Sequence, residues 1–272
     1  MDNAAAKHKD CFGLTGGLSG TQIKIAGVIM MVFDHLYYMF NTNGIPSWFH
    51  WLGRPVAPMF LFICTEGFAH TRSRKRYLLQ LLAAYELMNI ISTVLGFALP
   101  NENIMLIFSI FGSLFFAALY MLFIDMFRDG VKTKKPGTAA LAVLLMVLPI
   151  VYSMATMVVL SAQQAEVPQW LTFVLFKFIP NIMVVEGNLV WMLFGALFYI
   201  LRQRRILQVI PLVLFGIICL FTGSIEWLVI FAAVPVLLYN GSRGKGGKYF
   251  FYIFYPAHIY LFYIIAYLLQ KK

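Results

Sequence analysis

Residues 20–40 read GTQIKIAGVIMMVFDHLYYMF, an apolar run of the length that one membrane-spanning helix needs. A bilayer core is crossed by roughly 20 helical residues. The run nevertheless carries Lys24 near its start and the pair Asp34 and His35 near its middle. Ionisable groups inside a bilayer are costly and mark functional sites, so this stretch predicts both the fold and the place of a site.

The whole chain shares this apolar character. Of its 272 residues, 61% are apolar and 12% are charged, and the mean hydropathy is +0.80. Soluble domains are roughly half apolar and about a quarter charged. The composition therefore predicts an all-α integral membrane protein, a polytopic helical bundle. The formal charge of +10 sits in short clusters between apolar runs, which is typical of cytoplasmic loops and speaks against nucleic-acid binding.

A window of roughly 20 apolar residues divides the chain into about nine predicted transmembrane helices, with eight to ten left open. Residues 1–21 are predicted to be a cytoplasmic tail and residues 22–270 a single transmembrane domain. The stretch 166–188 is predicted to hold one span beside a re-entrant or surface segment, because its Pro, Asn and Glu residues need cover by protein or water. The predicted spans are 22–40, 55–70, 77–99, 103–127, 138–160, 182–201, 206–221, 225–239 and 249–269.

The connections between these spans alternate in charge. Basic connections lie at 71–76, 128–137, 202–205 and 240–248, and the connections between them carry no Lys or Arg. Lys and Arg are enriched in cytoplasmic loops, so the alternation predicts that the N-terminus lies in the cytoplasm. The three cysteines are far apart and predict neither a disulfide nor a metal site.

Lys24 and His35 are predicted to share one face of the first helix. They are eleven residues apart, which is close to three whole turns and about 16 Å along the axis. Asp34 points elsewhere, because adjacent residues on a helix do not face each other. A partner for His35 is therefore expected from another helix, and Glu66 and His258 are the best placed by depth.

Other ionisable residues lie in or near the predicted spans. We expect Glu226 and Asp125, close to predicted ends, to face lipid headgroups. Arg54 and His70 also lie close to predicted ends, where the same explanation is open. Deeper positions are stronger candidates for a site, and Glu86 is one of them besides those already named. Lys177 and Glu186 complete the set of candidates.

A basic residue at the cytoplasmic rim and a histidine about halfway across suit a long ligand with an anionic end and a reactive tip. Coenzyme A thioesters have this shape, and histidine exchanges protons near neutral pH. The basic loop 71–76 is a candidate for the phosphates through Arg72, Arg74, Lys75 and Arg76, although a topology signal alone explains it equally well. The chain shows no glycine-rich phosphate loop.

Three blocks resemble one family. They are IKIAGVIMMVFDHLYYMF (23–40), LGRPVAPMFLFICTEGFAHTRSRKRYLLQLL (52–82) and GKYFFYIFYPAHIYLFYIIAYLL (247–269). Together they resemble the TraX family, membrane proteins linked to N-terminal acetylation of conjugative pilin. A wider likeness connects the chain to the acyltransferase-three superfamily and related transmembrane acetyltransferases. In that superfamily an Arg precedes the first-helix His by the spacing that separates Lys24 from His35, so lysine here keeps the charge and loses the bidentate fork.

The resemblance implies transfer of an acetyl group from cytoplasmic acetyl-CoA to an acceptor at or across a bacterial inner membrane. His35 would be the general base or a transient acyl carrier, with Lys24 on a CoA phosphate. Arg54 and Glu66 would line the site, and His258 with Tyr255 would close its wall or polarise the thioester. Asp34 would tune the site through a neighbouring helix. No metal is implied.

The acceptor is left open between a pilin-like peptide amine and a glycan, and a homo-oligomer is also left open. Besides the bilayer, no other partner is predicted. Two competing readings remain. A secondary transporter would also place charges in the bilayer, although the chain shows no inverted repeat. A non-catalytic subunit of a conjugation or secretion system would function without CoA and tolerate changes at Lys24 and His35.

Overall fold

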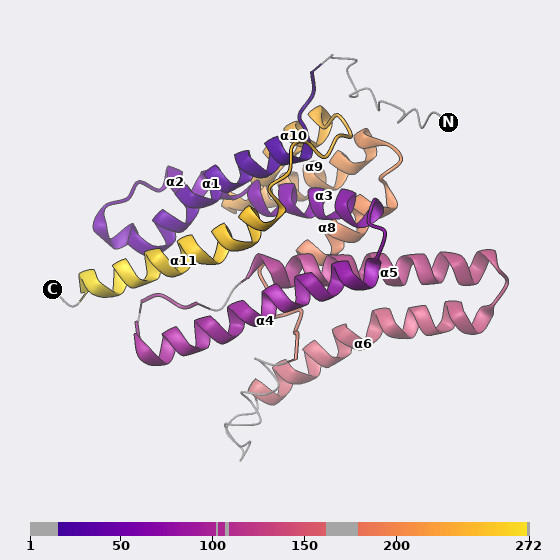
Figure 1. Ribbon diagram of the computed structural model, residues 1–272, viewed down its shortest axis with the longest axis horizontal. Coiled ribbons are helices and arrows are strands. Elements are labelled where there is room, and N and C mark those ends of the chain that lie inside the picture. Colours follow the sequence, from indigo (N-terminus) through magenta and orange to yellow (C-terminus); the bar gives the residue numbers. More distant parts are fainter. Residues whose placement is uncertain (1–15, 102, 107–108, 162–178, 271–272) are drawn as a thin grey trace. The chain divides into compact units, whose positions relative to one another are not determined.

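A computed structural model describes residues 16–101, 103–106, 109–161 and 179–270, and the regular elements in these ranges are helices. An isolated β-bridge joins Leu18 to Tyr239. Figure 1 shows the elements in chain order, which are α1 (Gly20–Phe40), η1 (Asn41–Asn43), α2 (Trp48–Gly53), α3 (Val56–Ala69), α4 (Arg74–Ala98), α5 (Ile110–Lys132), α6 (Pro136–Ser161), α8 (Asn188–Ile200), α9 (Arg205–Phe221), η2 (Ile225–Ala232), α10 (Ala233–Leu238) and α11 (Lys248–Gln270).

Helix coincides with each of the nine predicted spans, and the all-α membrane class is confirmed. In the described part of the chain, five helices are long and apolar enough to cross a membrane, at Gly20–Asn43, Arg74–Ala98, Ile110–Lys132, Pro136–Val159 and Tyr249–Gln270. The helices at 188–200, 205–221 and 225–238 are apolar but shorter. The count of nine spans and the cytoplasmic N-terminus stay predictions. Much of the stretch 166–188, with Lys177, lies outside the described residues.

Three predicted boundaries differ from the structure for local reasons. The span predicted from 103 begins at Ile110, because the Ser109 side chain accepts a hydrogen bond from Phe111 N and caps the helix there. The span predicted from 182 begins at Asn188, after a turn in which Gly187 has a φ of +65°. The predicted loop 41–51 contains most of α2, a helix too short to show a periodic pattern.

The chain divides into two compact units that alternate along the sequence. Among the described residues, the first contains 16–63, 101, 103–104 and 200–270. The second contains 64–100, 105–106, 109–161 and 179–199. The predicted single domain at 22–270 stays a prediction.

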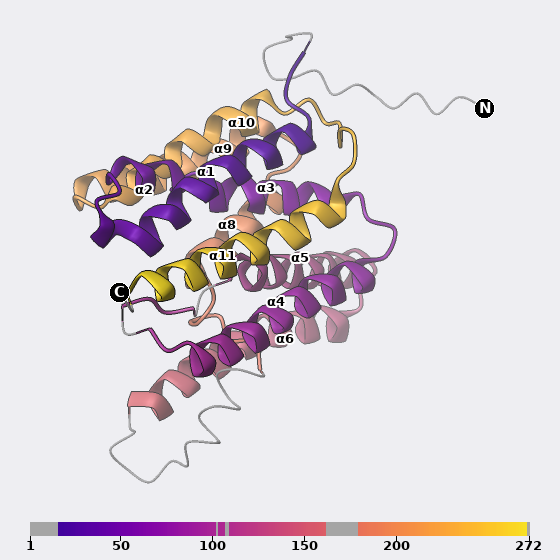
Figure 2. The ribbon, with the colours of Figure 1, turned by 60° about the vertical axis from the view of Figure 1, so that its left-hand side comes forward.

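In the first unit, α1 and α11 lie side by side (Figures 1 and 2). The start of α1 is tied to the loop that leads into α11. Gly20 N donates to Ser242 O at 2.9 Å and Thr21 N to Arg243 O at 3.0 Å. An added Cβ on Gly244 would lie 2.7 Å from Ser19 Oγ, so a glycine is needed for this close approach. The basic loop 240–248 and the start of α1 therefore lie at one end of the unit.

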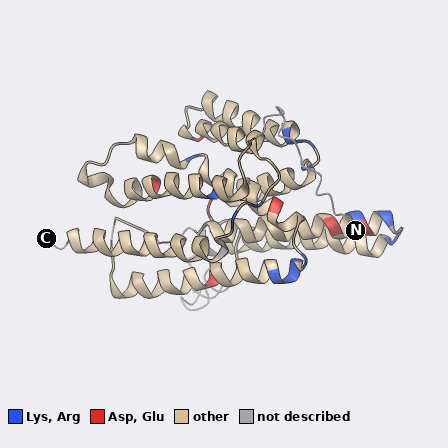
Figure 3. Ribbon diagram, turned by 45° about the horizontal axis from the view of Figure 1, so that its top comes forward, with Lys and Arg blue, Asp and Glu red and all other residues tan. Residues whose placement is uncertain are grey.

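The second unit is built on α4, α5 and α6, with α5 the most buried of the long helices. A tight turn joins α5 to α6, where an added Cβ on Gly130 would lie 2.6 Å from Ala139 N. Tyr120 donates its hydroxyl to the Met146 carbonyl at 2.6 Å, close to Pro149, where the helix ladder lacks an N–H. Figure 3 shows that most of the ribbon carries no charge and that much of the Lys and Arg lies near helix ends.

Candidate functional site

Asp34 and His35 are neighbours on α1, but their side chains contact different helices. His35 Nδ1 lies 2.7 Å from Nε2 of His258, on α11. Asp34 instead accepts from residues of α2 and the α2–α3 junction, His50 and Arg54. The Asp34-His35 pair in the sequence is therefore two separate contacts in the fold, and the partner of His35 is one of the two expected from depth.

The hydrogen bonds of His258 fix how the two rings share their protons. Nδ1 of His258 lies 2.7 Å from the Phe254 carbonyl. A carbonyl only accepts, so this nitrogen donates, and in the neutral ring Nε2 then holds a lone pair. Nδ1 of His35 must donate to that lone pair, since one of the two facing nitrogens has to carry the proton. With both rings neutral, the remaining nitrogen, Nε2 of His35, is left with a lone pair.

Aromatic side chains of α11 hold this histidine pair in place. His258 is 6% exposed, and its ring stacks on Phe254 with centroids 4.9 Å apart and an interplanar angle of 19°. Phe262 meets the same ring edge-on at 5.8 Å. Tyr255 is buried, with its ring centroid 6.1 Å from that of His35. The orientation of His258, and with it the tautomer of His35, is therefore set by packing as well as by the backbone hydrogen bond.

Lys24 lies on the same face of α1 as His35, as the spacing predicts. Its Nζ is 5.3 Å from the centre of the Phe251 ring, two turns before His258 on α11. Both residues therefore face α11. Lys24 lies one turn after Gly20 and Thr21, whose backbone N–H groups bond to the loop 240–248. Arg243 and Lys245 of that loop are exposed. The first unit thus gathers positive charge at one end of the line that leads to His35.

A family model described as TraX protein matches residues 19–266, which include Lys24, His35 and His258. The chain belongs to the TraX family.

A curated relative of this TraX-family chain is similar over nearly its whole length. It is described as "Probable fimbrial assembly protein FimC, serogroup H1" from Dichelobacter nodosus. The two are 26% identical over 262 residues, which cover 89% of this chain and 93% of the relative. No solved structure matches the chain.

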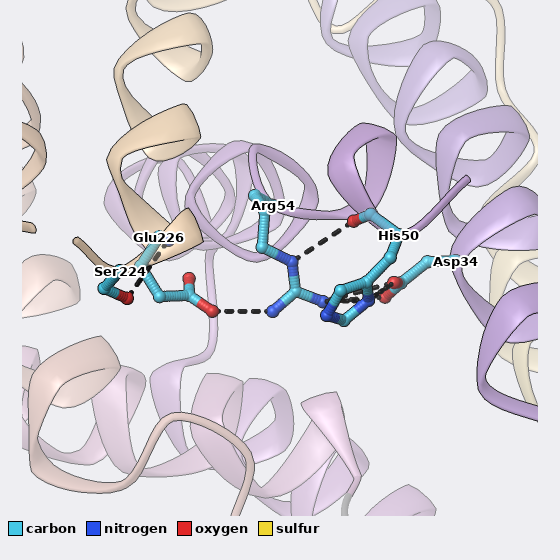
Figure 4. A network of polar contacts seen from close by, with 5 residues as sticks. All are labelled: Asp34, His50, Arg54, Ser224 and Glu226. Carbon is cyan, nitrogen blue, oxygen red and sulfur yellow. Dashed lines mark hydrogen bonds and ion pairs between the residues drawn. The ribbon is translucent and has the colours of Figure 1, made fainter. Parts of the chain in front are cut away.

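Arg54 ties two carboxylates of the TraX-family chain together (Figure 4). Its Nη2 donates to both oxygens of Asp34, at 3.1 and 3.2 Å, and its Nη1 donates to Glu226 Oε1 at 2.7 Å. His50 completes the group, with Nδ1 2.7 Å from Asp34 Oδ1. We call Asp34, His50, Arg54 and Glu226 the Arg54 cluster. Arg54 was predicted as a cofactor-binding residue, and here its guanidinium is occupied by the two carboxylates.

Glycine at position 53 makes room for the Arg54 cluster. Gly53 is buried at the end of α2, and an added Cβ would overlap the side-chain carbons of Asp34. The carboxylate therefore lies directly against the α2 backbone, between His50 and Arg54.

Replacing Gly53 by alanine is expected to displace Asp34 and to destabilise the folded protein by about 1–3 kcal/mol, the usual cost of overpacking. The thermal unfolding midpoint in a mild detergent would measure this. Gly96→Ala in α4 is the matched control, because the described structure places no heavy atom within 4 Å of an added Cβ there. Alanine favours a helix over glycine by up to about 1 kcal/mol. Equal midpoints for the two variants would contradict the steric account.

The remaining predicted site residues belong to the second unit. Glu66 is buried, 7% exposed, in α3. Of the four cations of loop 71–76, Arg72, Lys75 and Arg76 are exposed. Arg74 is the least available to a ligand, because its Nη1 pairs with Asp125 Oδ2 at 2.6 Å and its guanidinium lies over Phe68.

Glu226 and Asp125 were expected to face headgroups, and that expectation stays a prediction. Both also have protein partners that were not expected: Glu226 pairs with Arg54, and Asp125 pairs with Arg74 and accepts from the Tyr199 hydroxyl at 2.7 Å. Their partners come from distant parts of the sequence, so position near the end of a span gave no sign of the pairing.

Sequence reasoning also missed His50. The signal was the spacing of His50 and Arg54, four residues apart, which places both on one side of a helix turn. It was hidden because the segment was taken for a loop. As for metals, the described ranges bring no three His, Cys, Asp or Glu side chains together as a metal site requires.

Proposed function

We propose that this protein is a membrane-embedded acetyltransferase that moves the acetyl group of cytoplasmic acetyl-CoA to the N-terminal amine of a pilin-like peptide. The carrying observation is the His35–His258 pair, which leaves one ring nitrogen of His35 as a base. Membership of a family linked to pilin acetylation and the similarity to a fimbrial assembly protein support the peptide over a glycan as acceptor.

Binding of acetyl-CoA is assigned to the face of α1 that meets α11. Lys24 and the exposed Arg243 and Lys245 supply positive charge for the phosphates at one end. The pantetheine arm would follow the helix over about 16 Å, at 1.5 Å per residue. That length brings the thioester to His35.

The chemistry uses the lone pair on Nε2 of His35. As base, it takes a proton from the attacking amine while the C–N bond forms, and returns it to the sulfur as the C–S bond breaks. His258 stays in place and accepts from Nδ1 of His35, which stabilises the imidazolium while the proton is held. Attack of the same lone pair on the thioester would give an acetyl-imidazole instead. Trapping of labelled His35 separates the two routes.

Replacing Lys24 by glutamine is expected to raise KM for acetyl-CoA about tenfold, or about 1.4 kcal/mol, with little change in kcat. A phosphate contact far from the thioester contributes equally to ground state and transition state. Steady-state kinetics of the purified protein would measure the change. Lys24→Arg keeps the charge and is expected to retain most of the affinity.

Acetyl-pantetheine, which lacks the nucleotide phosphates, is the control donor for this variant. Wild-type protein and Lys24→Gln should use it equally well. An equal loss with both donors would show that Lys24 acts on the fold and not on the phosphates.

Thiol release from acetyl-CoA tests the proposed function as a whole. Purified protein in nanodiscs should release free CoA at a rate that depends on added peptide with a free N-terminus. A peptide whose N-terminus is already acetylated should not support release. Identical rates with both peptides, or none with either, would refute the proposal.

A second candidate function is favoured by the name of the relative. A fimbrial assembly factor without catalysis would bind the pilin-like subunit and act without CoA. In cells, it would support pilus formation with alanine at both Lys24 and His35, whereas loss of pilin acetylation in that variant favours the enzyme.

A further inference from the structure

Two histidines flank the same turn of α1 and come from different directions. His258 reaches His35 from α11, and His50 reaches Asp34 from α2. The His50 ring also stacks on Tyr37, three residues further along α1, with centroids 5.2 Å apart and an interplanar angle of 23°. The proposed acetyl transfer uses the contact between His35 and His258, and the contact between Asp34 and His50 has no role in it.

The Asp34–His50 contact has the geometry of a carboxylate that orients a base. Asp34 is ionised beside Arg54, which donates to both of its oxygens, so its oxygens only accept. Nδ1 of His50, 2.7 Å away, must then carry a proton and donate it. In the neutral ring Nε2 of His50 holds the lone pair, and the side chain remains 32% exposed. The carboxylate also stabilises the imidazolium that forms when Nε2 takes up a proton.

The charged and titratable groups around the contact between His50 and Asp34 come from three elements. Asp34 and Tyr37 lie on α1, and Arg54 follows His50 by one turn, with Nη2 3.3 Å from His50 Nδ1. Glu226, on η2, faces Arg54 from its other side. The two carboxylates balance much of the positive charge that Arg54 and a protonated His50 bring together. Protonation of His50 therefore does not leave an unbalanced cation cluster.

Acetylation of a peptide N-terminus needs two proton acceptors. An α-amino group has a pKa of about 7.7–8.0, so at neutral pH most of it is an ammonium that cannot attack a carbonyl. One proton must leave before attack, and a second leaves when the amide forms. His35 can pass only one of these to the departing sulfur.

We propose that His50, oriented by Asp34, is the base that takes the first proton from the acceptor ammonium. The inference rests on the proposed acetyl transfer and assigns the acceptor side of that reaction. His50 Nε2 removes one proton and leaves the neutral amine. The amine nitrogen attacks the thioester carbon, and its second proton goes to His35 Nε2. The C–S bond breaks, and the thiolate takes that proton to become CoA thiol. His50 then releases its proton to water.

Arg54 and Glu226 are positioning residues in this scheme. Arg54 keeps Asp34 ionised and in place, and Glu226 holds the other side of the guanidinium. Neither is assigned a contact with the acceptor.

The test compares the pH dependence of kcat/KM for wild-type protein and His50→Gln, with a peptide acceptor and acetyl-CoA. Without the base, only the fraction of peptide that is already an amine can react. The half-maximal pH of the variant should therefore rise to that of the free amine, with a loss of about twentyfold at about pH 6.5 that disappears above about pH 9. Asp34→Asn should shift the profile in the same direction.

A peptide with an aminooxy group in place of its N-terminal amine is the matched acceptor, since its weakly basic nitrogen is unprotonated across this range. With this acceptor the loss caused by His50→Gln should not change with pH and should be smaller than the loss with the amine at low pH, and the remaining turnover also shows that the variant is folded. A loss that is equal at every pH and with both acceptors, or no loss at low pH, would overturn the inference and leave the proposed function standing. Wild-type protein that acetylates neither acceptor would overturn the proposed function and this inference together.

Discussion

Replacing His35 by alanine is expected to lower kcat for acetyl transfer by about 10²- to 10⁴-fold, the range that a positioned general base contributes. The variant loses Nε2 of His35, the ring nitrogen that keeps a lone pair when Nδ1 donates to His258. Binding of acetyl-CoA through Lys24 should remain, so KM should change little. Steady-state rates of CoA release by the purified variant would measure the effect.

His70→Ala is the matched control for this variant. His70 is an exposed histidine of the second unit whose Nδ1 lies 2.8 Å from the Glu66 carbonyl, at the end of α3. Its loss should change kcat by no more than roughly twofold, since surface substitutions usually have small effects. Near wild-type turnover by His35→Ala would remove His35 from the mechanism.

Replacing Arg54 by methionine is expected to destabilise the protein by about 2–4 kcal/mol, because it leaves Asp34 and Glu226 without their shared cation. Breaking a fully buried ion pair costs about 3–5 kcal/mol. These side chains remain 19–30% exposed, so the expected destabilisation is smaller than that for a fully buried pair. The thermal unfolding midpoint in detergent would measure the loss.

Two further variants make the Arg54 prediction specific. Arg54→Met with Glu226→Gln should recover part of the lost stability, since one unpaired carboxylate is gone. Arg128→Met, in an exposed arginine that lies over the Tyr199 ring at 5.9 Å, should cost less than about 1 kcal/mol. A midpoint for Arg54→Met as high as that of Arg128→Met would mean that the Arg54 cluster carries no net stability.

Helix periodicity and depth were enough to predict one half of the site. The spacing of Lys24 and His35 places them on one face, and both do face α11. The same periodicity separates Asp34 from His35, and depth pointed to two candidate partners, Glu66 and His258, of which His258 is the one in contact. These predictions succeed because α1 and α11 are long, regular helices whose residues keep their angular positions over many turns.

The other half of the site could not be predicted from one sequence. The pair of Arg54 and Glu226 joins residues 172 positions apart, and no local pattern reports such a contact. His50 lies on a helix of six residues, too short for an apolar period. Gly53 reads as a loop residue, although its real function is to let a carboxylate lie against the backbone. The roles of these residues depend on contacts with distant parts of the chain and on close packing, which a local sequence pattern does not report.

One predicted helix boundary was wrong because a local contact, and not hydropathy, sets where the helix begins. Apolar residues continue through 104–106, so hydropathy extends the predicted span beyond the helix, whereas the Ser109 cap sets the true start at Ile110. Capping is a single hydrogen bond, and a window of roughly 20 residues averages it away.

The mass of the peptide product tests the central claim most directly. Purified protein in nanodiscs is incubated with a pilin-like peptide and acetyl-CoA that carries a deuterated acetyl group, and the recovered peptide is sequenced by mass spectrometry. The account predicts a deuterated acetyl group on the N-terminal nitrogen with wild-type protein, and none above the protein-free background with His35→Ala. Equal labelling by the two proteins, or no labelling by wild-type protein, would contradict it.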